Sequence, residues 1–105
     1  MMIIETPTFT RRVSELLTDE DYRKLQIALV NRPQAGVVIR GSGGLRKIRW
    51  ASSGRGKRGG VRIIYYWAVE PEQLLMLFVF AKHERDDLTP DQLKILKTIA
   101  EDEYP

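Results

Sequence analysis

The chain has 105 residues, a hydrophobic share of 43%, a charged share of 30% and a formal net charge of +3. This length and composition fit a single folded domain over residues 1–105 and exclude an intrinsically disordered chain. The absence of cysteine excludes disulfides, cysteine-ligated metal centres and thiol catalysis. No signal-peptide pattern begins the sequence, and the longest apolar run, 74–81, is too short to span a bilayer, so we expect a cytoplasmic protein with no membrane partner.

The N-terminal residues predict a short strand followed by a helix. Residues 2–5 are mostly apolar and indicate an edge strand. Thr6-Pro7 then opens a helix, because proline is favoured at the first helical position. Apolar residues recur after it at the three- and four-residue spacing of one buried helix face, namely Phe9, Val13, Leu16 and Leu17.

A second helix is predicted to begin at Thr18. This residue is a good N-cap, and the three acids after it lie in the first turn, where the helix dipole favours negative charge. Asn31 and Arg32 close the helix, and Pro33 prevents its continuation. The expected buried face consists of Tyr22, Leu25, Leu29 and Val30.

From residue 35 the pattern changes to that of β-strands with short connections, which favour antiparallel neighbours. The unbroken apolar run after residue 73 indicates a central strand covered on both faces. The expected strands are 37–39, 45–50, 61–69 and 74–82, with turns at 42–44 and 71–73 and a glycine-rich basic loop at 52–60.

The C-terminal element is a helix that begins at Thr89. Pro90 suits the first helical position, and Gln92 stands three residues after the cap, which is a capping-box pattern. Its apolar face contains Leu93, Leu96, Ile99 and Ala100. The whole order predicts an α+β fold, with two N-terminal helices and a C-terminal helix on a mostly antiparallel sheet.

Charge is unevenly distributed along the chain. Residues 22–69 contain no aspartate or glutamate but eleven lysines and arginines, so all fourteen acids lie outside this segment. Such asymmetry produces a local field that attracts polyanions. The residues expected to bind a phosphate backbone, as distinct from acting on it, are Arg40, Arg46, Arg55, Lys57 and Arg58.

Strand alternation divides the basic segment into two groups. Lys47 and Arg49 are two residues apart, so they project from one face about 7 Å apart, while Ile48 and Trp50 face the core. The hairpin connection should bring Arg62 beside them. Lys82 and His83 end the following strand and are expected to join the same face.

A cationic face of this kind suits metal-free RNA cleavage. The ribose 2′-OH attacks the adjacent phosphorus, which requires a base, cations around the phosphorane and an acid for the leaving oxygen. The forked guanidinium of Arg62 suits the phosphorane, and Lys47 or His83 could exchange protons. The same residues also suit simple phosphate binding without catalysis, so both interpretations stay open from the residues alone.

No metal or cofactor is expected. One histidine and no cysteine leave few metal ligands, and the acids at 84–87 alternate with a cation. The glycine-rich segment 54–60 lacks the GxxxxGK[ST] pattern and precedes a strand, so it provides no helix N-terminus for a nucleotide phosphate.

Three segments in this order resemble the RelE/HigB family of bacterial type II toxins. They are Leu-Arg-Lys-Ile-Arg-Trp at 45–50, Gly-Gly-Val-Arg-Ile-Ile-Tyr-Tyr at 59–66, and Phe-Ala-Lys-His-Glu-Arg-Asp-Asp-Leu-Thr at 80–89. The resemblance covers nearly the whole chain, and the second and third segments look most like the HigB-like branch.

The resemblance implies a ribosome-dependent mRNA endonuclease. Such toxins cut mRNA in the A site of the 70S ribosome without metal, and a cognate antitoxin, often with a DNA-binding helix-turn-helix, neutralises them. By position, Lys47 and Arg49 match the family's basic pair and Arg62 its strand arginine. His83 stands where some members have an arginine, and Thr89 near where some have a tyrosine. These departures leave Lys82 or His83 as the proton donor.

Two alternatives accompany this prediction. A ParE-like toxin on the same scaffold would poison DNA gyrase and would not need a converging basic group on the sheet. A non-catalytic RNA-binding regulator would bind RNA in a salt-sensitive way without arresting growth.

Overall fold

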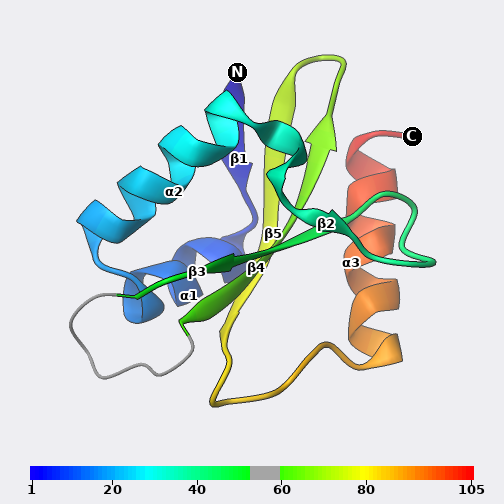
Figure 1. Cartoon of the computed structure of the whole chain (residues 1–105). Coiled ribbons are helices and arrows are strands. Elements are labelled where there is room, and N and C mark those ends of the chain that lie inside the picture. The colour runs from blue at the N-terminus through cyan, green and yellow to red at the C-terminus, as the bar shows by residue number, and fades with distance from the viewer. Residues whose placement is uncertain (53–59) are drawn as a thin grey trace.

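The computed structural model describes residues 1–52 and 60–105 and shows an α+β fold (Figure 1). The predicted fold class is confirmed: two N-terminal helices and a C-terminal helix pack on a sheet. In the described residues the elements are β1 (Met2–Glu5), α1 (Pro7–Leu16), α2 (Asp19–Asn31), η1 (Pro33–Ala35), β2 (Val37–Val38), β3 (Arg46–Trp50), β4 (Val61–Ala68), β5 (Gln73–Ala81) and α3 (Pro90–Glu103).

The five strands form one mixed sheet in the order β1-β5-β4-β3-β2. Strands β2 to β5 form an antiparallel meander, because their connections are short. Strand β1 forms one edge of the sheet and pairs in parallel with β5. Helices α1 and α2 follow β1 in the chain and lead to β2 at the opposite edge. The meander and the edge position of β1 were predicted, whereas its parallel pairing was not.

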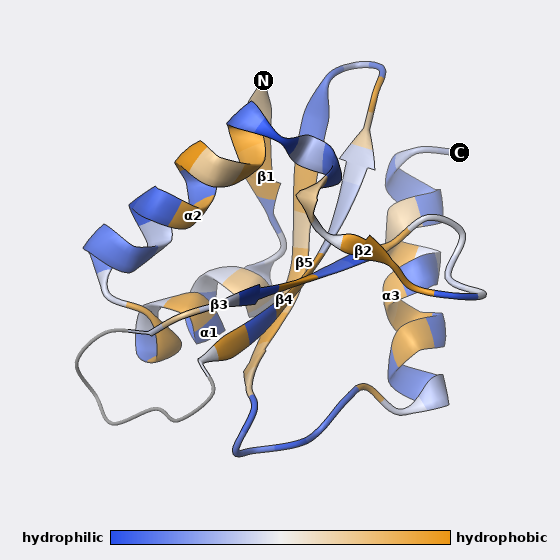
Figure 2. Ribbon diagram, in the orientation of Figure 1, coloured by the Kyte–Doolittle hydropathy of each residue, from blue (hydrophilic) through white to orange (hydrophobic). Residues whose placement is uncertain are grey.

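Each face of the sheet is covered by its own hydrophobic core. Phe9 and Leu16 of α1 and Leu25 of α2 pack on one face against alternate residues of β4 and β5. Leu96 and Ala100 of α3 pack on the other face against the intervening residues. In the hydropathy colouring most of β5 is apolar, whereas β4 also contains polar and weakly polar segments (Figure 2). Alternate residues of both strands are buried on both faces of the sheet. This confirms the prediction of a central, doubly covered strand.

Four predicted details, two of burial and two of strand ends, are wrong. Val30 is 41% exposed, because Leu25 and Leu29 already define the buried stripe of α2 and Val30 is one residue beyond it. Ile99 is 37% exposed, so α3 presents its apolar face only in part. Strand β4 ends at Ala68 and leaves Val69 exposed in the turn, and β5 ends at Ala81, so Lys82 lies outside the strand.

The three predicted helix starts are confirmed, and the cap of α3 allows a test. The backbone N–H of Gln92 donates to Thr89 Oγ1 at 3.1 Å, and the backbone N–H of Thr89 donates to Gln92 Oε1 at 2.9 Å, which completes a capping box. We expect Thr89→Ala to lower the unfolding free energy by about 1 kcal/mol. In a domain of this size that lowers Tm by about 4–8 °C.

The matched control for this cap is Thr98→Ala in the same helix. Thr98 is exposed, and its hydroxyl donates to the Lys94 carbonyl one turn earlier, a bond that does not stabilise a helix. Thermal unfolding followed by circular dichroism should therefore show a loss for Thr89→Ala and none for Thr98→Ala. Equal Tm values for the wild type and Thr89→Ala would contradict the prediction.

Candidate functional site

The register of β3 against β4 brings the predicted basic residues together. Arg49 stands directly opposite Arg62, and Lys47 stands opposite Ile64. Directly opposed residues of antiparallel strands point to the same face, so these three cations share the face on which Ile64 contacts the α3 core. The expected convergence of Lys47, Arg49 and Arg62 is confirmed, and we call these three residues the cation cluster.

The opposite side of β3 anchors the strand. Ile48 and Trp50 pack against the core formed with α1 and α2, as the alternation predicted. The Trp50 indole N–H also donates to the Asp21 carbonyl of α2 at 3.1 Å. These contacts fix the rotation of β3 and thereby the direction in which Lys47 and Arg49 project.

Arg62 is the buried member of the cation cluster. It is 7% exposed, whereas Arg49 is exposed. Burial lowers the pKa of the Arg62 guanidinium, the charge of Arg49 lowers it further, and Asp87 opposes both effects. A buried fork beside a second guanidinium favours a bound anion, because an anion relieves the repulsion between the two cations.

Asp87 belongs to the site although the sequence did not reveal it. Its Oδ2 accepts a hydrogen bond from Lys47 Nζ at 3.0 Å, and its Oδ1 accepts one from the Leu88 amide at 2.8 Å. Partial burial raises the pKa of Asp87, but these hydrogen bonds and the charges of Lys47 and Arg62 outweigh it and hold the pKa below its ordinary value. The carboxylate therefore stays ionised next to two of the three cations.

Lys82 and His83 lie in the turn that follows β5, and both are exposed. The Lys82 amide donates to the Gly60 carbonyl at 3.3 Å, which puts this turn at the same end of the sheet as the start of β4. Among the described residues, no hydrogen bond or ion pair joins either side chain to the cation cluster. Their role in proton transfer stays a prediction.

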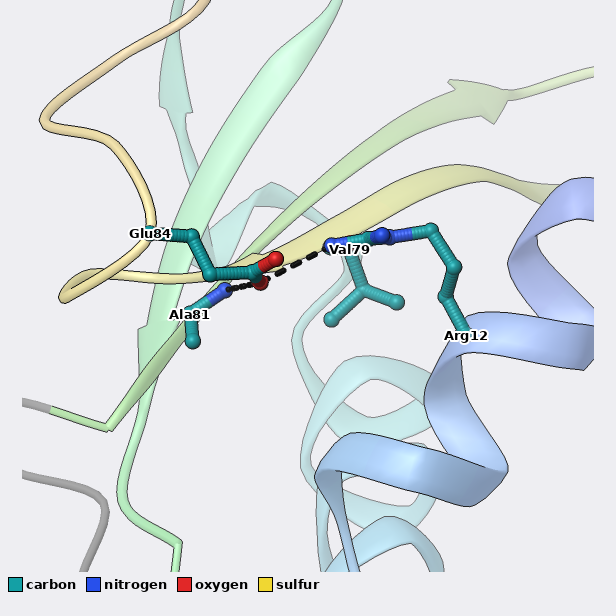
Figure 3. Close-up of polar contacts among 4 residues, drawn as sticks. All are labelled: Arg12, Val79, Ala81 and Glu84. Carbon is teal, nitrogen blue, oxygen red and sulfur yellow. Dashed lines mark hydrogen bonds and ion pairs between the residues drawn. The ribbon is translucent and has the colours of Figure 1, made fainter.

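A contact from α1 holds that turn in place (Figure 3). Arg12 Nε donates to the Val79 carbonyl at 2.7 Å and Arg12 Nη2 to Glu84 Oε1 at 2.9 Å. The same Glu84 oxygen accepts the Ala81 amide at 2.9 Å. The Ala81 hydrogen bond and the Arg12 charge together hold the pKa of Glu84 below its ordinary value despite some burial. Arg12 thus ties the start of the segment that carries Asp87 to the helix layer.

The five residues predicted to bind RNA do not share one structural setting. Arg46 Nη1 donates to the carbonyls of Gln34 and Gly36 at 3.1 and 2.8 Å, so Arg46 fastens β3 to the segment before β2. Arg40 is exposed in the turn between β2 and β3. The remaining predictions, Arg55, Lys57 and Arg58, lie outside the described residues. RNA binding by all five stays a prediction.

An apolar groove lies away from the cation cluster and has a different character. The groove, of about 510 Å³, runs between α3 and the start of α1. Aliphatic and aromatic side chains dominate its lining and none of the lining residues is charged, so it does not suit a phosphate; they include Leu77, Phe78, Leu88, Ile95, Leu96 and Ile99. We therefore place the candidate site at the cation cluster.

The described residues offer little for a metal or a membrane. No three histidine, aspartate or glutamate side chains within 1–52 and 60–105 gather in a way that could hold a metal ion. Within the same residues, no helix combines the length and apolar character needed to cross a bilayer.

The sequence did not predict the contacts made in this region by Asp87, Glu84 and Arg12. Asp87 and Glu84 stand in a mixed-charge segment without periodicity, and their partners Lys47 and Arg12 are 40 and 72 positions away. The available signal was that the segment 82–89 joins a central strand to the last helix and must therefore cross the sheet beside the basic strands.

Comparison with known proteins agrees with this architecture. In solved structures, the chain is similar to a free-state mutant of the E. coli toxin RelE in which two arginines are replaced by alanine. The TM-score is 0.64 at 16% identity, over 94% of this chain and 95% of that chain, which shows a shared fold. The family model described as the RelE toxin of the RelE/RelB toxin–antitoxin system matches residues 1–104. Because that match spans nearly the whole chain, the protein belongs to the RelE toxin family and is the toxin of a toxin–antitoxin system, with a cognate antitoxin as its partner.

Proposed function

We propose that this toxin is a ribosome-dependent endoribonuclease that cuts mRNA in the A site without a metal ion. The observation that carries the proposal is the direct pairing of Arg49 with Arg62, with Lys47 on the same face of the sheet. Membership of the RelE family supports an RNA substrate, because toxins of this family are in general endoribonucleases. The cell compartment that fits such a substrate is the cytoplasm.

The proposed reaction is attack by the ribose 2′-OH on the adjacent phosphorus. The 2′-OH loses its proton to a base, the bond to the 5′-oxygen breaks, and that oxygen receives a proton from an acid. Arg62 holds the charged phosphorane with its fork, while Lys47 and Arg49 bind the phosphate and assist the 2′-OH. His83 or Lys82, in the exposed turn after β5, supplies the last proton.

The proposal includes two partners with defined chemistry. The cognate antitoxin carries a helix-turn-helix that binds DNA, and the 70S ribosome presents the mRNA. Arg40, Arg46, Arg55, Lys57 and Arg58 bind the phosphate backbone of ribosomal RNA. The HigB-like branch stays a prediction, since the family match is to RelE toxins as a whole.

Primer extension on a defined mRNA after induction of the toxin tests the proposal. We expect discrete new 5′ ends at codon positions within the translated region, and none in the same message when its start codon is removed. Expression of the neighbouring antitoxin should restore growth. DNA breaks with intact mRNA would instead indicate a ParE-like gyrase poison, and salt-sensitive RNA binding without growth arrest would indicate a regulator.

A further inference from the structure

The carboxylate of Asp87 lies beside the cation cluster, and the proposed reaction does not use it. Asp87 Oδ2 accepts a hydrogen bond from Lys47 Nζ at 3.0 Å, and the Leu88 amide fixes the other carboxylate oxygen at 2.8 Å. The carboxylate also lies close enough to Arg62 for each charge to affect the other. A phosphate oxygen bound by Lys47 would therefore compete with this carboxylate oxygen.

A phosphodiester and this carboxylate compete for the same lysine. Both groups are anions that prefer to accept from the Lys47 ammonium, and two anions this close repel each other. The Leu88 amide orients the carboxylate toward Lys47, so the competitor is held in place in the absence of RNA. The Lys47 ammonium has two further N–H donors, but repulsion between the two anions weakens phosphate binding until Asp87 moves away.

We infer that Asp87 is a specificity-determining residue that weakens the binding of free RNA and so biases the cation cluster toward a strand held by the ribosome. The inference rests on the proposed endoribonuclease function. A ribosome presents one phosphate at a high effective concentration, which favours the exchange of partners at Lys47. A free strand has no such advantage and meets the ion pair intact.

The exposure of the ion pair sets the size of the effect. The Lys47 side chain is 33% exposed and that of Asp87 is 59% exposed, so solvent screens the attraction. Partly exposed pairs of this kind correspond to about a two- to five-fold change in an equilibrium constant. That strength suits a competitor which a positioned phosphate can displace.

The test compares Asp87→Asn with Asp86→Asn in the full chain. Both variants remove one negative charge from the same exposed segment, but only Asp87 is paired with Lys47 among the described residues. The probe is a short fluorescent oligouridylate with 2′-O-methyl groups, which cannot be cleaved because the attacking hydroxyl is blocked. Fluorescence anisotropy without ribosomes, over a series of KCl concentrations, gives the affinity and its salt dependence.

We expect Asp87→Asn to bind the probe about two- to five-fold more tightly than the wild type. The slope of log K against log salt should become steeper by about 0.7, because Lys47 then neutralises one more phosphate of a single strand. Asp86→Asn should leave the slope unchanged. In a Lys47→Ala background, Asp87→Asn should no longer change the affinity, since the competition at Lys47 has been removed.

Three results would overturn the inference. The first is an equal change in probe affinity for Asp87→Asn and Asp86→Asn. The second is weaker probe binding by Asp87→Asn than by the wild type. The third is no probe binding by the wild type or by Asp87→Asn. Since the probe cannot be cut, the outcome is independent of catalysis: a wild-type toxin that leaves mRNA intact in primer extension would refute the endoribonuclease and not this competition. Thermal unfolding of each variant confirms that a changed affinity does not reflect a changed fold.

Discussion

Arg62→Ala should slow mRNA cleavage by about two to three orders of magnitude, a loss of about three to four kcal/mol of transition-state stabilisation. Arg62 is the buried member of the cation cluster and stands opposite Arg49, so its guanidinium is held in a fixed direction. A donor fixed in this way contributes most when charge develops on the phosphorane. Single-turnover cleavage of mRNA on purified ribosomes measures the effect directly.

Two further variants separate geometry from charge. Arg62→Lys keeps a positive charge but loses the planar fork that can hold two oxygens, so it should recover only part of the rate. Lys94→Ala removes a charge from the exposed face of α3 and should cleave like the wild type. Because Arg62 is 7% exposed, the unfolding transition of each variant must be measured beside its rate. An Arg62→Ala toxin that stays folded and arrests growth as strongly as the wild type would refute the role proposed for Arg62.

Local patterns in the sequence predict much of the site. A two-residue period is enough to place Lys47 and Arg49 on one face of β3, with Ile48 and Trp50 in the core behind them. The hairpin then brings Arg62 next to them whatever the form of the intervening loop, and the register confirms this. These predictions succeed because each depends on residues that are neighbours in the chain or are joined by one connection.

The features that were not predicted depend on contacts distant in sequence. The parallel pairing of β1 with β5 joins Ile3 to Leu74, and no local signal specifies it. Asp87 reaches Lys47 only because the segment after β5 crosses the face of β3 on its way to α3. The prediction that Lys82 lies in a strand failed for a related reason: a turn fastened by Glu84 begins at that residue, and Arg12 of α1 holds Glu84 in place.

Gly60→Ala should destabilise the fold far more than a matched glycine substitution elsewhere. Gly60 has a φ of +65°, and a Cβ built there would lie 2.2 Å from the Trp50 carbonyl oxygen. Its own carbonyl accepts the Lys82 amide at 3.3 Å, so this residue joins the ends of β3, β4 and β5 beside the cation cluster. We expect a loss of about 2–5 kcal/mol, from left-handed backbone strain together with the steric overlap.

Gly41→Ala is the control that isolates the overlap. Gly41 has a φ of +73°, but no atom lies within 4 Å of the position of its Cβ, so only the backbone strain of about 1–2 kcal/mol applies. Urea unfolding followed by the fluorescence of Trp50 and Trp67 should therefore give a clearly larger loss for Gly60→Ala. Equal losses of unfolding free energy for the two variants would contradict the prediction, because the backbone near Trp50 would then have moved to make room for the Cβ. The rate of cleavage by Gly60→Ala should fall in proportion to its folded fraction. Arg62→Ala should lose cleavage while it remains folded. This contrast distinguishes a residue that shapes the site from one proposed to contact the phosphate.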